Sequence, residues 1–486
     1  MKLDLLAGRA RALAGAGLLS LVATPAFAAV DKGDTGFMFL CTVLVLLMTV
    51  PGLALFYGGL VRSKNMLSVL MQVFTITCVV ALIWLTYGYS MAFTSGGELN
   101  SFVGGFSKVF LSGVAIDAPA ATFSNGVSIY EYSFIAFQMT FACITPALVV
   151  GAFAERMKFS AILAFTVLWV TFVYFPMAHM VWYWAGPDAL AAAAKAVADA
   201  PAEGKAAAQA ALDAVVADAG YIFAMGAIDF AGGTVVHINA GIAGLVGAIL
   251  VGRRVGYGRE AMPPHSLTMT MIGASLLWVG WFGFNCGSNL ESNAVAIMAM
   301  LNTFGATAAA GVSWILVEWM IKGKPSLLGL ASGVVAGLVA VTPASGFAGP
   351  MGAICLGLVA GVVCFIFCTG IKNALGYDDS LDVFGVHGIG GIIGAIGTGI
   401  VADPSLGGAG IADYISKPGE LVVAPFDMVN QVIIQAKAVG VTILWCGVIS
   451  TVIFLLIKFT IGLRPTTDQE REGLDLVDHG ERAYSY

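Results

Sequence analysis

Long apolar runs separated by short polar connections dominate the sequence. After residue 28 we count eleven runs of about 20 residues, the length that an α-helix needs to cross a bilayer core of about 30 Å. They begin near Gly36, Met66, Tyr130, Phe159, Phe230, Ser266, Ala294, Ser326, Gly349, Leu381 and Val432. The pattern therefore predicts an all-α integral membrane protein, with one membrane domain over residues 29–463 and a polar tail over 464–486.

The composition supports a chain that is embedded in membrane lipid. Hydrophobic residues make up 59% of the chain and charged residues 11%, whereas soluble domains average about 25% charged residues. The net charge of −6 is modest and gives no indication of a nucleic-acid partner.

The first 28 residues have the order of a secretory signal peptide. Basic residues precede a short apolar run, Leu13–Val22, and the small-residue site Ala26-Phe27-Ala28 follows it. We predict cleavage after Ala28; an uncleaved first helix is the alternative. Cleavage implies a bacterial inner membrane, with the mature N-terminus outside.

The distribution of basic residues agrees with that orientation. The connections predicted to be cytoplasmic hold fourteen Lys and Arg residues, and those predicted to be outside hold six, as the positive-inside rule requires. The C-terminal tail is then cytoplasmic. The alanine-rich outer loop Pro187–Gly220 is predicted to form a solvated helix.

A histidine and a series of glycines occur twice in the same spacing. His237 and His387 each precede three glycines, at 241, 244 and 247 and at 391, 394 and 397. The first lies in span five and the second in span ten, so residues 36–253 and 266–401 form an inverted five-plus-five repeat, plus an eleventh helix. Glycines on one helix face allow two helices to approach closely.

An ionisable residue at membrane depth costs roughly 2.5–3.5 kcal/mol or more when it is charged. A single membrane histidine is as consistent with a structural hydrogen bond as with function. Two in repeat-related positions, His237 and His387, favour one shared path for a small polar species. We expect His179, His265 and His479 to be structural.

Several aromatic residues can be ordered by depth above these histidines. Phe137, Trp182 and Ser288 would form the outermost layer, and Phe141 and Phe284 the layer beneath it. Such a layer suits a small cation that donates hydrogen bonds, since cation–π attraction contributes about 0.5–2 kcal/mol. The alternative is that these aromatic side chains serve packing or the interface belt.

Two aspartates precede the histidine-bearing segments. Asp229 is predicted to cap the N-terminus of the helix that carries His237, and Asp382 to play the same part before His387. The sequence has no His-Glu-x-x-His zinc helix and no phosphate-binding loop. We therefore predict no metal and no cofactor, and an intramembrane enzyme is disfavoured.

Five motifs carry a family resemblance. They are Asp229-Phe-Ala-Gly-Gly-Thr-Val-Val-His237-Ile-Asn-Ala, Gly151-Ala-Phe-Ala-Glu155-Arg156, Gly280-Trp-Phe-Gly-Phe-Asn285, Asp382-Val-Phe-Gly-Val-His387 and Glu472-Gly-Leu-Asp475. The chain resembles the ammonium transporter family, the Amt branch of the Amt/Rh superfamily, from about Gly36 to Tyr486.

The resemblance implies eleven helices, a homotrimer with one pore per subunit, and ammonium as substrate. Ammonium would be bound at an outer site and deprotonated; ammonia would cross while the proton is carried separately. By motif, Phe137, Trp182 and Ser288 match the family's recruitment site, and Asp229 matches the acidic residue that holds its architecture. Phe141 and Phe284 match the gate, and His237 and His387 match the twin pore histidines. Trp281 and Thr342 match secondary pore residues. The tail resembles a regulatory C-terminus that responds to P-II signalling proteins.

Two alternatives remain within the same fold. One is an Rh-like ammonia or gas channel, which the aromatic and serine set at the outer mouth disfavours. The other is an ammonium sensor, which would bind ammonium without conducting it.

Overall fold

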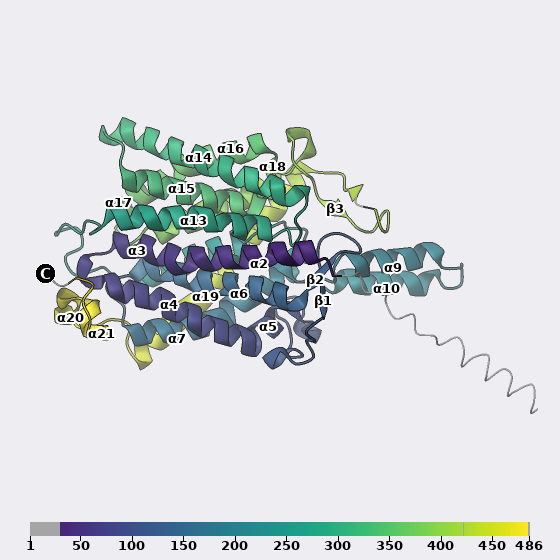
Figure 1. The fold of residues 1–486 in the computed structure, drawn as a ribbon, viewed down its shortest axis with the longest axis horizontal. Coiled ribbons are helices and arrows are strands. Elements are labelled where there is room, and N and C mark those ends of the chain that lie inside the picture. The colour runs from purple at the N-terminus through teal and green to yellow at the C-terminus, as the bar shows by residue number, and fades with distance from the viewer. Residues whose placement is uncertain (1–29, 421, 485–486) are drawn as a thin grey trace, which may run out of the picture.

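The computed structural model describes residues 30–420 and 422–484. The predicted signal peptide, residues 1–28, lies outside the described residues. Within the described part, eleven helical segments are long and apolar enough to cross a membrane, the number that the sequence predicts. They run side by side in a single bundle (Figure 1).

The first five spans consist mostly of short helices that continue one another. In chain order they are α2 (Lys32–Leu47), η1 (Met48–Leu53) and α3 (Ala54–Leu60); η2 (Ser63–Asn65), α4 (Met66–Ile83), η3 (Trp84–Gly88) and α5 (Tyr89–Phe93); α6 (Glu131–Val149) and η6 (Val150–Phe153); α7 (Phe159–Trp169), η7 (Val170–Tyr174) and α8 (Phe175–Trp182); and η8 (Gly233–Ile238) with α12 (Asn239–Val251).

The next five spans and the long final helix complete the bundle. They are α13 (Leu267–Gly287); α14 (Ala294–Lys322); α15 (Leu327–Val341) with η9 (Thr342–Ala344); α16 (Pro350–Phe365), η10 (Ile366–Ile371) and α17 (Lys372–Leu375); η11 (Phe384–Gly388) with α18 (Ile389–Val401); and α19 (Met428–Thr460). Short elements in the connections include the hairpins β1 (Pro119–Ala121) with β2 (Ser128–Tyr130) and β3 (Ala412–Asp413) with β4 (Val422–Val423).

Six of these described spans contain a π-helical turn, namely η1, η3, η7, η8, η10 and η11. π-Helical turns are rare and frequently mark functional sites. Two of them, η8 and η11, begin spans five and ten and hold His237 and His387. The inverted repeat therefore places the same irregularity at the same point of each half.

Small residues determine how closely the helices pack. A Cβ built on Gly357 of α16 would lie 2.2 Å from the carbonyl oxygen of Ala306 on α14, and one on Gly361 would lie 2.4 Å from that of Ala310. Backbones can come this close only where side chains are absent. This contact accounts for part of the glycine content of the chain, 61 residues in 486.

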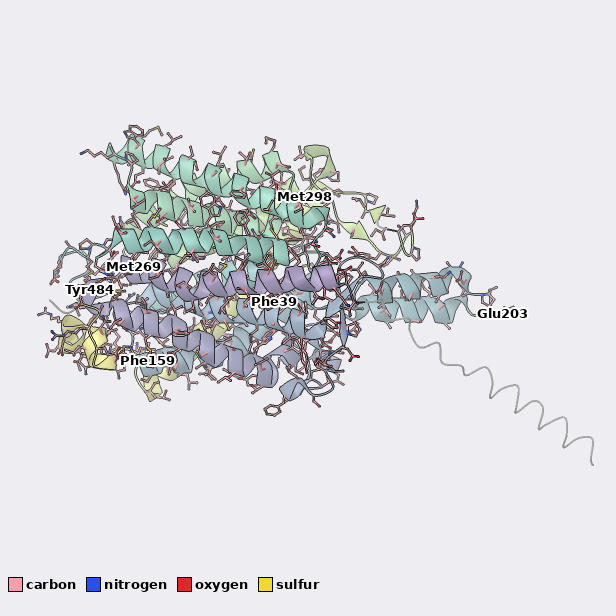
Figure 2. The ribbon with its side chains drawn as sticks, in the orientation of Figure 1. Phe39, Phe159, Glu203, Met269, Met298 and Tyr484 are labelled. Atoms are coloured by element: carbon pink, nitrogen blue, oxygen red, sulfur yellow. The ribbon has the colours of Figure 1, made fainter. Side chains whose placement is uncertain are left out.

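The alanine-rich loop is a hairpin of two helices rather than the single helix that we predict from its composition. Helix α9 (Pro187–Asp199) and helix α10 (Lys205–Ala217) are separated by a turn in which Gly204 N donates to Pro201 O at 2.9 Å. Proline and glycine both end a helix. The hairpin projects beyond one end of the bundle, with Glu203 near its tip (Figures 1 and 2).

The C-terminal segment lies at the opposite end of the bundle (Figure 1). It forms α20 (Thr467–Glu472) and α21 (Leu474–His479). The carboxylate of Asp475 accepts hydrogen bonds from the backbone N–H groups of Leu67 and Ser68 at 3.0 and 2.7 Å, at the start of α4. The tail is therefore docked onto the membrane domain.

A buried group of charges lies at the same end of the bundle as the tail. Glu155 is 1% exposed; it accepts from Arg62 Nε at 3.0 Å and pairs with Arg254 Nη1 at 3.0 Å. Arg254 also pairs with Asp378 at 2.8 Å. Burial alone would raise the pKa of Glu155, but the two guanidinium groups hold that pKa below its ordinary value. The network joins four connections that are far apart in sequence.

We predict that Glu155→Ala destabilises the protein by about 1.5–3 kcal/mol, because the partly buried Arg62 and Arg254 lose a buried carboxylate partner, while Arg254 keeps Asp378. A drop in the thermal unfolding midpoint in detergent measures this. The matched control is Asp199→Ala, which removes an exposed pair with Lys195 on the α9–α10 hairpin, and it should leave the midpoint unchanged. Equal shifts for the two variants would contradict this role of Glu155.

Candidate functional site

The structure brings the two repeat-related histidines together in the middle of the bundle. Nδ1 of His237 lies 3.3 Å from Nδ1 of His387. The ring centroids are 5.4 Å apart and the rings are tilted by only 17°. The side chains are buried, at 1% and 4% exposure. Two ionisable groups from opposite halves of the chain therefore share one small volume.

Glycine contacts between the two halves allow this approach. A Cβ on Gly241 of α12 would lie 2.2 Å from Cα of Gly388 in η11. On the other side, a Cβ on Gly391 of α18 would lie 3.1 Å from the carbonyl oxygen of Gly233 in η8. The first glycine of each predicted series thus lies where one histidine-bearing segment crosses the other.

An aspartate caps each of these segments. Asp229 accepts from the backbone N–H groups of Gly232 and Gly233 at 2.9 and 2.6 Å, and from that of Thr234 at 2.8 Å, which agrees with the predicted cap. Each such bond satisfies a helix-terminal N–H group that has no partner within the helix.

The second cap is not the residue that the sequence analysis selects. Asp382 forms an ion pair with Lys372 and has a positive φ of 61°. Asp379 instead accepts from Val383 N at 3.0 Å and Phe384 N at 2.7 Å. Burial and the nearby Asp382 carboxylate raise the pKa of Asp379 to about 6. The prediction for Asp382 is therefore wrong, because the cap lies three residues earlier.

Aromatic rings connect the histidines to one end of the bundle in an unbroken series. His237 lies 6.0 Å from Phe284, which stacks on Phe141 at 4.1 Å and 24°. Phe141 in turn contacts Phe137 at 4.9 Å and Trp182 at 5.9 Å, both edge to face. The order of these contacts is the order of depth that the sequence predicts.

The outermost predicted residues differ in how they are held. Trp182 is partly exposed, and its Nε1 donates to the backbone oxygen of Asp229 at 3.0 Å. Ser288 is also partly exposed, and its hydroxyl donates to Phe284 O at 2.9 Å. Phe137 is fully buried. Trp182 is thus tied to the cap of the segment that carries His237.

The two secondary residues form one unit. Trp281 stacks on His237 at 5.4 Å and 16°. Its Nε1 donates to Thr342 Oγ1 at 2.8 Å, and the Thr342 side chain is fully buried. Thr342 therefore acts on the site through Trp281, which it holds against the imidazole.

A narrow cavity of about 10 Å³ lies beside the paired rings. Both histidines line it, and the other lining side chains are apolar, including Leu148, Leu277 and Phe284. A cavity of this size accommodates about one water-sized molecule. Nε2 of His237 is buried and has no hydrogen-bond partner among the described residues. The space suits one small molecule and excludes a hydrated ion.

Comparison with known proteins now gives this geometry its context. The model of the Ammonium Transporter Family matches residues 36–484. This chain belongs to the ammonium transporter family. Its relatives include the "Ammonium transporter" of Bacillus subtilis (strain 168), 43% identical over 93% of this chain and 99% of that one, and that of Aquifex aeolicus (strain VF5), 42% identical over 96% and 98%.

Solved structures of this family share the fold. "Sensor Amt Protein" superposes with a TM-score of 0.75 at 27% identity, covering 92% of this chain and 98% of that one. Saccharomyces cerevisiae Mep2 gives 0.74 at 29% identity, covering 91% and 89%. These Amt and Mep neighbours assign the chain to a transporter family rather than to an enzyme class, and to the branch that the sequence motifs indicate.

We predict that Gly241→Ala lowers both the thermal unfolding midpoint and ammonium-evoked transport. The new methyl group would overlap the backbone of Gly388, and overpacking a dense core costs about 1–3 kcal/mol. Gly440→Ala is the matched control, because nothing lies within 4 Å of a Cβ at that position on α19. Wild-type stability and transport in the Gly241 variant would show that the crossing does not set the histidine geometry.

Proposed function

We propose that this family member recruits ammonium at an aromatic outer site, removes a proton, and conducts ammonia past the paired histidines while the proton travels separately. The observation that carries the proposal is the pair of imidazoles, 3.3 Å apart, in a cavity that is otherwise apolar.

The apolar lining supports ammonia rather than ammonium as the species that passes the centre. Moving an isolated charge into a medium of low dielectric costs tens of kcal/mol by idealised solvation estimates. The cavity beside His237 and His387 offers no carboxylate to offset that cost. Neutral ammonia is small enough for the space and can donate a hydrogen bond to an imidazole nitrogen.

The distance between the rings supports a pair that holds at most one extra proton. Two imidazolium charges 3.3 Å apart would repel each other by about 5 kcal/mol at an effective dielectric constant of about 20. In the neutral pair, one Nδ1–H points at the other Nδ1, so one Nε2 carries a proton and the other is free to accept one. A proton that binds the free Nε2 makes that ring an imidazolium. This ring can pass the shared Nδ1 proton to the second ring, which then releases the proton on its own Nε2. One proton has entered and one has left, both rings are neutral again and their roles are exchanged, which suits a proton relay.

The partly exposed face of Trp182 supports cation recruitment at the outer end. A cation that contacts the indole face gains about 0.5–2 kcal/mol, and Ser288 supplies a hydroxyl oxygen that can accept an N–H. We assign Phe137 a supporting part, because it is fully buried and packs against Phe141, which in turn contacts Trp182. The backbone oxygen of Asp229 holds Trp182 by accepting a hydrogen bond from its indole Nε1.

Phe141 and Phe284 are proposed as the gate. Their rings stack at 4.1 Å, in contact with the outer layer on one side and with His237 on the other. Both are buried, so a molecule passing between these layers requires the rings to move. Side-chain motion of this kind commonly controls access to a transport or catalytic site.

We extend the proposal to assembly, location and regulation from the family resemblance and the charge distribution. The chain would form a homotrimer with one pore per subunit in a bacterial inner membrane, with its mature N-terminus outside and residues 464–486 in the cytoplasm. The docked tail, with Asp475 bonded to α4, is the proposed contact region for a P-II-type signalling protein.

We predict that His387→Ala abolishes ammonium-evoked current in proteoliposomes on a solid-supported membrane, or uncouples proton movement from ammonia flux, because the relay partner of His237 is gone. Cys355→Ala, which alters an exposed side chain on α16, is the control and should conduct normally. Unchanged current in the histidine variant would count against the proposed pore. An ammonium sensor, by contrast, would bind ammonium and give no current in the wild type.

A further inference from the structure

His179 has an unusual hydrogen-bond environment. It lies in α8, three residues before Trp182, and its side chain is fully buried. Its Nδ1 is 2.9 Å from the carbonyl oxygen of Ala92, and its Nε2 is 2.6 Å from that of Asn100. Both ring nitrogens therefore face atoms that can only accept a hydrogen bond.

The proton count of the ring follows from these partners. A neutral imidazole has one N–H and one lone pair, so it can donate to only one of the two oxygens, and its lone pair would face the other. An imidazolium donates to both. We infer that His179 is an imidazolium and that it is a positioning residue for Trp182.

His265 shows the contrasting case in the same chain. Its Nδ1 lies 2.8 Å from Val61 O, but its Nε2 lies 3.0 Å from the hydroxyl of Tyr484. A hydroxyl can donate as well as accept. A neutral ring therefore satisfies both partners of His265, whereas it cannot satisfy both partners of His179.

The surroundings of His179 stabilise a positive charge. Tyr183 stacks on its ring at 4.4 Å and 14°. The carboxylate of Asp218 accepts from Asn100 Nδ2 at 2.9 Å and from the Tyr183 hydroxyl at 3.1 Å, so both neighbours of the ring are bonded to an anion. A nearby carboxylate and an aromatic face each favour a cation.

Two other charged residues near these elements are paired with each other, and the exposed Glu98 lies in the loop that follows α5. Lys108 and Glu131 form an ion pair, and Glu131 also accepts from the Tyr89 hydroxyl of α5 at 2.6 Å. The carboxylate of Asp218 is held next to the ring by its hydrogen bonds to the side chains of Asn100 and Tyr183.

The ring holds the end of span four in place. Through Ala92 and Asn100 it joins α8 to the end of α5 and to the loop that follows α5. Gly220 packs directly against His179 O, where a Cβ would lie 2.1 Å away. Three segments are therefore fixed around the last turn of α8, from which Trp182 reaches the cap at Asp229.

A change at His179 should therefore alter the affinity for ammonium through Trp182, and this expectation rests on the proposed function of Trp182.

The charge state can be tested without measuring transport. Solid-state NMR of the ¹⁵N-histidine-labelled full-length protein in proteoliposomes at pH 8, where an unperturbed histidine with a pKa of about 6.5 is neutral, should show one ring with both nitrogens protonated. That signal should disappear in His179→Gln and persist in His265→Gln. A neutral His179 ring at pH 8 would overturn the inference and leave the proposed transport function standing.

The positioning role is tested by the concentration of ammonium that gives half-maximal current. His179→Gln should raise it by about tenfold or more, the equivalent of one lost charged hydrogen bond, with less effect on the maximal current. His179→Lys, which retains the charge, should give a half-saturating concentration closer to that of the wild type. His265→Gln should give the wild-type value. If His179→Gln reached half-maximal current at the same ammonium concentration as the wild type, the positioning role of His179 would be refuted. If Trp182→Leu did so, the proposed ammonium site would be refuted instead.

Discussion

The close crossing of two helical segments at glycine is the constraint on which the rest of the structure depends. Because Gly241 and Gly388 have no side chains, the segments that carry His237 and His387 can meet backbone to backbone, and the two imidazoles come within hydrogen-bond reach. The π-helical turns at η8 and η11 and the aspartate caps place each ring at the crossing. The apolar cavity and the aromatic series are arranged around this pair.

Charged side chains lie away from this centre. The cavity is lined by apolar side chains and the two histidines, whereas the ion pairs of Glu155, Arg254 and Asp378 lie at one end of the bundle, in the connections between spans. At the other end, Asp218 lies beside the partners of His179. Both arrangements fix connections that are distant in sequence, and neither contributes a side chain to the cavity that His237 and His387 line.

The sequence predicts the features that repeat and misses those that depend on exact backbone geometry. Helix number, the pairing of His237 with His387 and the order of the aromatic layers follow from hydrophobicity and spacing. The second cap is Asp379 and not Asp382. Asp379 precedes His387 by eight residues, the same spacing as Asp229 before His237, and this shared spacing is the signal that identifies it. The turn that divides the outer hairpin also has a local signal, Pro201 and Gly204. The hydrogen bond between Thr342 and Trp281 depends on three-dimensional packing, which spacing alone does not describe.

The central claim is that nitrogen crosses the apolar centre without its charge. Potassium tests this claim most directly, because it is a monovalent cation with no proton to release. Proteoliposomes that contain only this protein should give a current on an ammonium pulse and none on an equal potassium pulse in the same preparation. A potassium current of comparable size would contradict the account, because it would show that an intact cation passes the paired histidines.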